Sequence, residues 1–160
     1  AFDGEGTPTK RLCLIGNGTL ENLLHSEATA RQFGVHPTGH AGLGAKVSVG
    51  PDWFEVSSSS GVSSAASHLD HRNASEPFVL IESLNALHAG VKASQGAFSL
   101  PFDGWLVKDG ERISVEAATI AGDIRDVLKG IVHLEPNEVV THQGVSPHVW
   151  VDGLAITGEA

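Results

Sequence analysis

One stretch of the chain decides its fold: Gly96-Ala-Phe-Ser-Leu-Pro-Phe-Asp-Gly-Trp-Leu-Val-Lys-Asp-Gly-Glu-Arg-Ile-Ser-Val-Glu-Ala-Ala-Thr-Ile-Ala-Gly-Asp-Ile-Arg-Asp-Val-Leu-Lys-Gly-Ile131. Trp105-Leu-Val107 leads into Asp109-Gly110, a dipeptide that accepts positive φ at little cost. Apolar residues resume at Ile113 and Val115. The pattern predicts two antiparallel strands joined by a tight turn.

The second half of the stretch predicts a helix. Asp123 follows Gly122 and can cap the free amides of a first helical turn. Beyond it, apolar residues recur with the i, i+3, i+4, i+7 spacing of one helical face. They are Ile124, Val127, Leu128 and Ile131. We expect this helix to pack against a sheet.

The N-terminal third carries similar local signals. The expected elements are a hairpin over 10–24 that turns at Asn17-Gly18, a helix from Ser26 to Phe33 that ends at Gly34, a loop over 36–44 and a strand over 45–49. Residues 57–67 are mostly serine and other small residues, which predicts a flexible surface loop.

Short strands are expected in the rest of the chain. They are 78–81, 133–134, 139–140, 149–151 and 154–156, the later ones divided by Pro136, Pro147 and Asp152-Gly153, while 82–89 fits strand and helix equally well. The sum is one α+β domain over residues 1–160, dominated by strands, with about two helices and an antiparallel sheet that curls or closes into a barrel.

Composition excludes several classes of function. Ten basic residues stand against 19 acidic ones, a net charge of −9 that opposes binding to the phosphates of nucleic acids. No secretory signal is visible and no apolar run approaches the roughly 18 residues of a membrane span, so we expect no membrane association and a cytoplasmic location. The one cysteine, Cys13, has apolar neighbours and is predicted to be a small buried side chain.

Three blocks of the sequence resemble one known family. They are Asp3-Gly-Glu-Gly-Thr-Pro-Thr-Lys-Arg11 with Thr29-Ala-Arg31, the central Thr119-Ile-Ala-Gly122 with Asp126-Val-Leu-Lys-Gly-Ile131, and the final Val151-Asp-Gly-Leu-Ala-Ile-Thr-Gly158. In this order they are similar to the C-terminal domain of the TldD/PmbA family, also called modulator of DNA gyrase. The resemblance implies that the chain is part of a larger C-terminal domain, with further residues upstream of Ala1.

The resemblance also implies a function. The chain is most similar to the TldE/PmbA type of subunit, which has no metal site of its own. Such a subunit pairs with a TldD-type metallopeptidase that cleaves unfolded or leader peptides. The zinc is then expected in the partner subunit, and this chain would supply neither a catalytic residue nor a cofactor ligand.

Nine histidines are many for this length, and some of them are candidate metal ligands. No histidine is followed by glutamate, so no His-Glu-x-x-His or His-Glu-x-x-x-His helix exists here. The family's third ligand is a cysteine in a loop that corresponds to Val140–Gly144, where this chain has none. His142 in that loop, and His68 and His71 around Asp70, are the weak candidates, since zinc needs three or four converging ligands.

Other side chains have ordinary structural interpretations. Ser99, Glu82 and Asp103 could take part in acid–base chemistry, but polar residues on half-exposed strands are usually solvated. Trp105 is expected in the core. An edge strand could bind an extended peptide by strand addition.

Two alternatives remain open from the sequence. The chain could be the C-terminal part of a catalytic TldD-type metallopeptidase, whose His-Glu residues lie upstream. It could also be a protein-binding modulator with no peptidase role.

Overall fold

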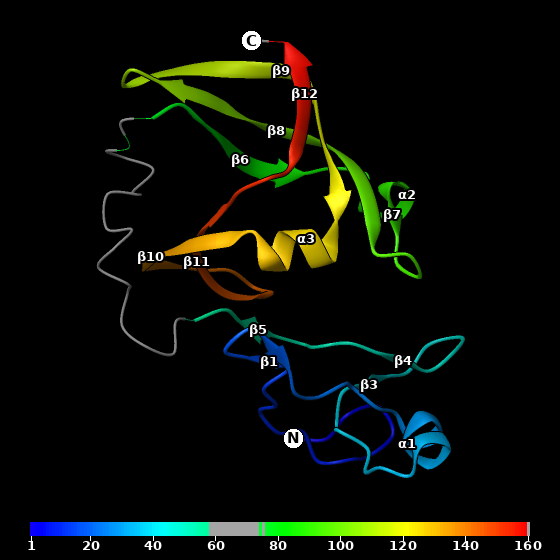
Figure 1. The fold of residues 1–160 in the computed structure, drawn as a ribbon. Coiled ribbons are helices and arrows are strands. Elements are labelled where there is room, and N and C mark those ends of the chain that lie inside the picture. The colour runs from blue at the N-terminus through cyan, green and yellow to red at the C-terminus, as the bar shows by residue number, and fades with distance from the viewer. Residues whose placement is uncertain (58–73, 75, 160) are drawn as a thin grey trace. The chain divides into compact units, whose positions relative to one another are not determined.

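The computed structural model describes residues 1–57, 74 and 76–159, and strands dominate it (Figure 1). Its compact units are Ala1–Val56 with Val140–Val145, and Ser57–Val139 with Ser146–Ala160. The described part holds three helices, against about two predicted. Most of the Ser-rich segment 57–67 lies outside the described residues.

The elements of the first unit are short. They are β1 (Ile15–Gly16), β2 (Thr19–Leu20), α1 (Glu27–Phe33), β3 (Ala41–Gly42), β4 (Ser48–Val49) and β5 (Phe54–Glu55). β1 pairs with β2 across Asn17-Gly18, and both turn residues have positive φ, as predicted. β3 and β4 form a second small hairpin, so the predicted 36–44 loop contains a strand at its end.

Helix α1 begins and ends where the sequence predicts. Ser26 accepts a hydrogen bond from the Thr29 amide, and the Thr29 hydroxyl accepts one from the Ser26 amide, at 3.3 and 3.0 Å. Thr29 thus does the work of the usual Glu or Gln in a capping box. Gly34 ends the helix with φ 67°, a conformation that costs glycine little.

Asp3 organises the start of the chain. Its Oδ1 accepts the amides of Glu5 and Thr7 at 3.0 and 2.9 Å, and its Oδ2 accepts the Ala41 amide at 3.0 Å. These hydrogen bonds lower the pKa of Asp3, the one from Ala41 contributing most. Glu5 in turn accepts the Glu27 amide of α1 at 2.8 Å. Two carboxylates therefore hold residues 1–8 against β3 and the helix.

The second unit holds the longer elements. They are β6 (Phe78–Leu84), α2 (Leu87–Gly90), β7 (Val91–Lys92), β8 (Ala97–Lys108), β9 (Glu111–Asp123), α3 (Ile124–Lys129), β10 (Ile131–Val140), β11 (Gly144–Val151) and β12 (Ala155–Glu159). The predicted central hairpin is β8 and β9, turning at Asp109 and Gly110 with φ 53° and 79°. Figure 1 shows it as the green and yellow-green ribbons. In the sheet order β12-β9-β8-β6, the edge strands β12 and β6 are not paired with each other. This sheet therefore curls without closing into a barrel.

The sheet has a kink where the register of three strand pairs shifts at one level. Pro101 of β8 pairs with Thr119 of β9, and Gly104 pairs with Val115. Between these two pairs β8 has two residues and β9 has three. The β12–β9 pairing shows the same extra residue in β9. On the other side, β6 has one extra residue opposite β8, at Glu82. Bulges on both neighbours of β8 therefore bend the sheet at Asp103 and Gly104.

Close backbone contacts fix this kink. A Cβ at Gly104 would lie 2.1 Å from the Leu80 carbonyl oxygen, so only glycine fits there. Ala117 takes the extra position of β9 with φ 48°, a conformation that side chains rarely adopt. A Cβ at Gly158 would lie 3.0 Å from the Ala118 Cβ. The two glycines let neighbouring strands follow the bulge of β9.

A small core lies on one face of the β8–β9 pair. Leu100 and Ile120, directly opposite each other, are buried with Phe102 and Ala118, and Val79, Ile81, Phe98, Val115 and Leu154 pack against them. No large side chain among the described residues is less than 2% exposed. Trp105, predicted in the core, is only half-buried. The core of the described residues is therefore small.

Helix α3 is shorter than the apolar spacing predicts. Asp123 caps it by accepting the Arg125 amide at 2.8 Å, and hydrogen bonds from the Arg125 side chain and amide lower the pKa of Asp123 to about 2. The helix ends at Gly130, whose Cβ position lies 2.5 Å from the Asp152 carbonyl oxygen. Ile131 already belongs to β10, so the prediction of one face through Ile131 is wrong.

The predicted packing of α3 on a sheet is only partly met. Ile124 and Leu128 are 49% and 46% exposed, and Val127 is half-buried. The face that the sequence marks as apolar is thus largely uncovered in this chain.

The prolines of β10 and β11 do not divide strands, contrary to prediction. Pro136 and Pro147 both lie inside continuous strands. Among the described residues, β10 is an edge strand in the order β10-β11-β5, and β5 pairs only with Gly144 and Val145, in parallel. Proline is tolerated where one strand edge needs no backbone donor.

Gly104→Ala tests the steric basis of the kink. Because the new Cβ meets backbone, we expect a loss of about 3 kcal/mol in the free energy of unfolding, measured by urea denaturation. Gly50→Ala is the control, since a Cβ there meets nothing within 4 Å, and its effect should stay within about 0.5 kcal/mol. Equal effects of the two substitutions would contradict the assignment.

Asp3→Asn tests the N-terminal carboxylate. An amide NH₂ cannot accept a backbone N–H, so at least one of the three hydrogen bonds is lost. We expect a lower Tm and faster hydrogen exchange at the amides of Thr7 and Ala41. Asp52→Asn, on an exposed carboxylate, should change neither, and unchanged exchange in the Asp3 variant would refute the role.

Candidate functional site

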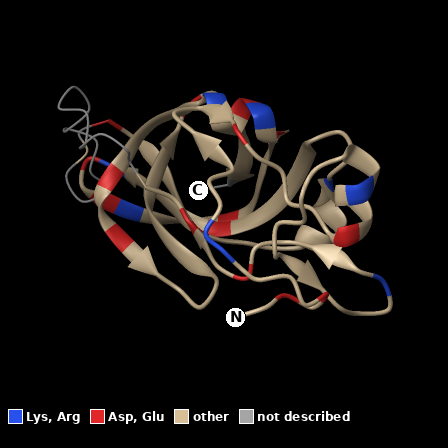
Figure 2. Cartoon of the chain, turned by 90° about the horizontal axis from the view of Figure 1, so that it is seen from below, with Lys and Arg blue, Asp and Glu red and all other residues tan. Residues whose placement is uncertain are grey.

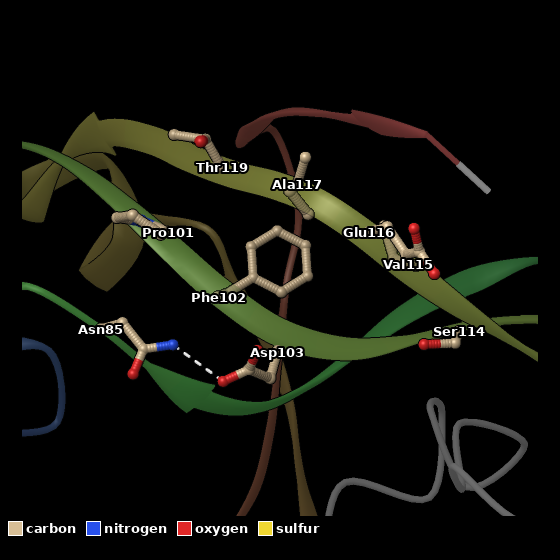
Figure 3. Close-up of a pocket in the computed structure, with 10 residues that line it drawn as sticks. Asn85, Pro101, Phe102, Asp103, Ser114, Val115, Glu116, Ala117 and Thr119 are labelled. Carbon is tan, nitrogen blue, oxygen red and sulfur yellow. Dashed lines mark hydrogen bonds between the residues drawn. The ribbon is translucent and has the colours of Figure 1, made fainter.

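The kink opens a hollow on the second unit. Its volume is about 570 Å³. Its lining comes from β8, β9 and the residue after β6, and comprises Asn85, Pro101, Phe102, Asp103, Ser114, Val115, Glu116, Ala117, Ala118 and Thr119. Figure 3 shows Phe102 and Ala117 in the middle of this set and Asn85 and Asp103 at one side. The hollow exists because the bulge of β9 separates backbones that would otherwise pair.

Asp103 is the best-positioned charged group of the hollow. Its Oδ2 accepts hydrogen bonds from the Asn85 side-chain amide and the Ser83 hydroxyl, both at 2.8 Å (Figure 3). These two donors, Asn85 first, lower the pKa of Asp103. The carboxylate is therefore ionised at neutral pH and held in one orientation. A group with a lowered pKa is a weak base, so the geometry suits electrostatic binding better than proton abstraction.

The hollow carries unbalanced negative charge. Neither Asp103 nor Glu116 forms an ion pair with the part of the chain that the structure describes. None of the described residues that line the hollow is a lysine or arginine. Figure 2 shows basic residues on several parts of the chain. The site is thus suited to a positively charged ligand group.

The Val140–Gly144 loop uses its polar groups internally. The Thr141 hydroxyl donates to the Gly144 carbonyl at 3.1 Å and accepts the amides of Gln143 and Gly144, both at 3.2 Å. The Gly144 backbone packs against Phe54, where a Cβ would lie 2.2 Å from the carbonyl oxygen. His142 is exposed at the tip. The loop is a hydrogen-bonded turn around a threonine.

The other predicted metal candidates cannot be placed in this fold. His68 and His71 lie outside the described residues. Across residues 1–57, 74 and 76–159, no three His, Cys, Asp or Glu side chains are placed to hold a metal ion.

Two polar residues of β10, His133 and Glu135, are buried, and Glu135 accepts the Trp150 indole N–H at 2.8 Å. Trp150 also packs its ring 4.8 Å from that of Phe78.

Cys13 corrects the prediction of a buried thiol. It is exposed and precedes β1, which begins only at Ile15. Reduced solvation and the nearby Glu21 carboxylate raise the pKa of the Cys13 thiol. A raised pKa leaves little thiolate, the form that binds metal or attacks substrates.

Of the acid–base candidates named from the sequence, only Asp103 lies in the hollow. Ser99 and Glu82 are exposed on β8 and β6. Sequence reasoning missed Asn85 and Ala117, since neither hydrogen bonding across strands nor positive φ at an alanine has a local signal. Gly104 inside an apolar strand was the available hint, because glycine within a strand often marks a bulge.

No helix among the described residues has both the length and the apolar character that crossing a bilayer requires.

Replacing the donors to Asp103 tests its electrostatics. We expect Asn85→Ala to raise the pKa of Asp103 more than Ser83→Ala does, measured by NMR titration of the carboxyl carbon. With its pKa lowered in the fold, ionised Asp103 stabilises the protein above pH of about 4, and this is lost as pH falls through the folded-state pKa. An unchanged pKa in both variants would exclude this hydrogen-bond network.

Comparison with known proteins identifies the family. The model of the PmbA/TldA metallopeptidase C-terminal domain matches residues 1–158. The chain is 27% identical over 148 residues to the metalloprotease PmbA of Escherichia coli O157:H7, which covers 90% of this chain and 29% of that protein.

Solved structures agree with this match. A protein of Thermotoga maritima described as a modulator of a DNA gyrase superposes with a TM-score of 0.79 at 32% identity, over 98% of this chain and 35% of its own. A second, from Bacteroides thetaiotaomicron, has a TM-score of 0.68 at 19% identity, over 99% and 33%, and supports the fold alone. The chain thus spans about a third of these relatives, and it belongs to the PmbA/TldD metallopeptidase family, in the part that forms the C-terminal domain.

Proposed function

We propose that the chain is the C-terminal part of a non-catalytic TldE/PmbA-like subunit in a cytoplasmic zinc metallopeptidase complex. Its partner is a TldD-type subunit, which holds the zinc and cleaves unfolded or leader peptides. This chain then completes the interface and shapes the peptide-binding chamber.

The observation that carries the proposal is the Val140–Gly144 loop. The family's metal-binding cysteine is expected there, and this chain has Thr141, whose hydroxyl is engaged by three hydrogen bonds within the turn. His142 is exposed, and the exposed Cys13 thiol has a raised pKa. The described residues therefore do not fit a zinc site, and no catalytic step is assigned to them.

Exposed apolar side chains support a subunit that works in a larger assembly. Ile124, Leu128 and Val132 are 49%, 46% and 53% exposed in neighbouring parts of the second unit. Phe33 and Leu43 of the first unit are 67% and 69% exposed. Covering such side chains contributes about 25 cal/mol for each Å² removed from water.

One observation favours an alternative. The Escherichia coli relative is named a metalloprotease, and ligands upstream of Ala1 would make this chain the end of a catalytic subunit. The third alternative, a protein-binding modulator without peptidase activity, draws on the description of the Thermotoga maritima relative.

Zinc content and cleavage distinguish the three. The whole reading frame that encodes this chain is expressed alone and together with a TldD-type subunit, and each preparation is analysed for zinc and for cleavage of an unstructured peptide. We expect one zinc per heterodimer and cleavage by the complex, with neither in the lone subunit. His142→Ala in the complex should leave both values unchanged.

Other results overturn the proposal. Stoichiometric zinc and cleavage in the lone subunit would establish the catalytic alternative. Failure to co-purify with the TldD-type subunit, with no zinc and no cleavage, would favour the modulator.

A further inference from the structure

We propose that the hollow at the kink of the second unit binds the positively charged side chain of an arginine or lysine in an extended peptide. The choice of a peptide as the carrier rests on the proposed function. The preference for positive charge rests on the hollow itself.

Charge gives the first argument. The Asp103 carboxylate lines the hollow, and Glu116 adds a second one from the opposite strand. Neither forms an ion pair within the described residues, and no basic side chain is among those that line the hollow. A guanidinium or ammonium group would supply the missing positive charge and donate hydrogen bonds to Asp103. Hydrogen bonds between two charged groups are stronger than those between neutral groups, so a basic side chain is favoured over a neutral one.

The shape of the lining gives the second argument. Pro101, Val115 and Ala117 contribute apolar surface beside the carboxylates. Long basic side chains bury their methylene stems along such surface while their charged ends reach a polar group. The volume of about 570 Å³ is within the range of sites for small ligands and exceeds what one such side chain needs. Room therefore remains for the backbone that carries it.

Rigidity gives the third argument. Ser83 and Asn85 hold the Asp103 carboxylate from β6 and the residue after it, at 2.8 Å each. The steric contact of Gly104 with Leu80 fixes β8 and β6 at the same level. A carboxylate oriented before the ligand arrives binds at a lower entropic cost than a mobile surface carboxylate.

A pair of isosteric peptides tests the charge preference. ¹⁵N-labelled 160-residue chain is titrated with N-acetyl-Ala-Ala-Arg-Ala-Ala-amide, and separately with the same peptide carrying citrulline, the neutral isostere of arginine. We expect the arginine peptide to shift the Asn85 side-chain amide and the Ala117 amide with saturation. The citrulline peptide should bind about tenfold more weakly, as expected for the loss of one charge-assisted hydrogen bond.

Two variants locate the effect. Asp103→Asn should weaken the arginine peptide about tenfold and leave the citrulline peptide unchanged. Glu111→Gln, which removes an exposed carboxylate next to the turn of the same hairpin, should change neither. If Asp103→Asn fails to fold, the peptide pair on the unchanged chain still decides.

Equal affinity for the two peptides, or shifts confined to other surfaces, would overturn the inference. These measurements need neither zinc nor a partner. A negative result therefore leaves the proposed function standing, and a positive result survives failure of the zinc and cleavage experiment.

Discussion

The approach of the Gly104 backbone to the Leu80 carbonyl is the constraint on which the second unit depends. It places β8 and β6 too close for any side chain between them, at the level where β9 carries an extra residue. Adjacent strands cannot bulge independently, because each ladder must keep its hydrogen bonds. The kink therefore propagates to β12, and Gly158 accommodates Ala118 at the far side.

The hollow follows from this constraint. On one face of the kinked strands, Leu100, Phe102 and Ile120 form the small core. On the same strands, Asp103 is exposed and held by Asn85 and Ser83. Side chains alternate between the faces of a strand, so Phe102 is buried in the core while the next residue, Asp103, is exposed. The bulges that bend the sheet therefore also position the candidate site.

The exposed apolar surface of the chain agrees with its match to only part of longer relatives. The chain matches about a third of relatives that are much longer. Its core lacks a fully buried large side chain among the described residues, and Ile124 and Leu128 of α3 remain about half exposed. A sheet and helix whose apolar faces are only partly covered are expected in a domain that works as part of a larger assembly.

The sequence by itself determined what depends on neighbouring residues. The Asp109-Gly110 turn, the Ser26 and Asp123 caps, and the end of α1 at Gly34 follow from local conformational preferences and local hydrogen bonds. The tertiary structure alone decided where α3 stops, why Pro136 and Pro147 lie inside strands, and that Asp103 meets Asn85. Each of these depends on the register between strands, which long-range packing sets and no local pattern records.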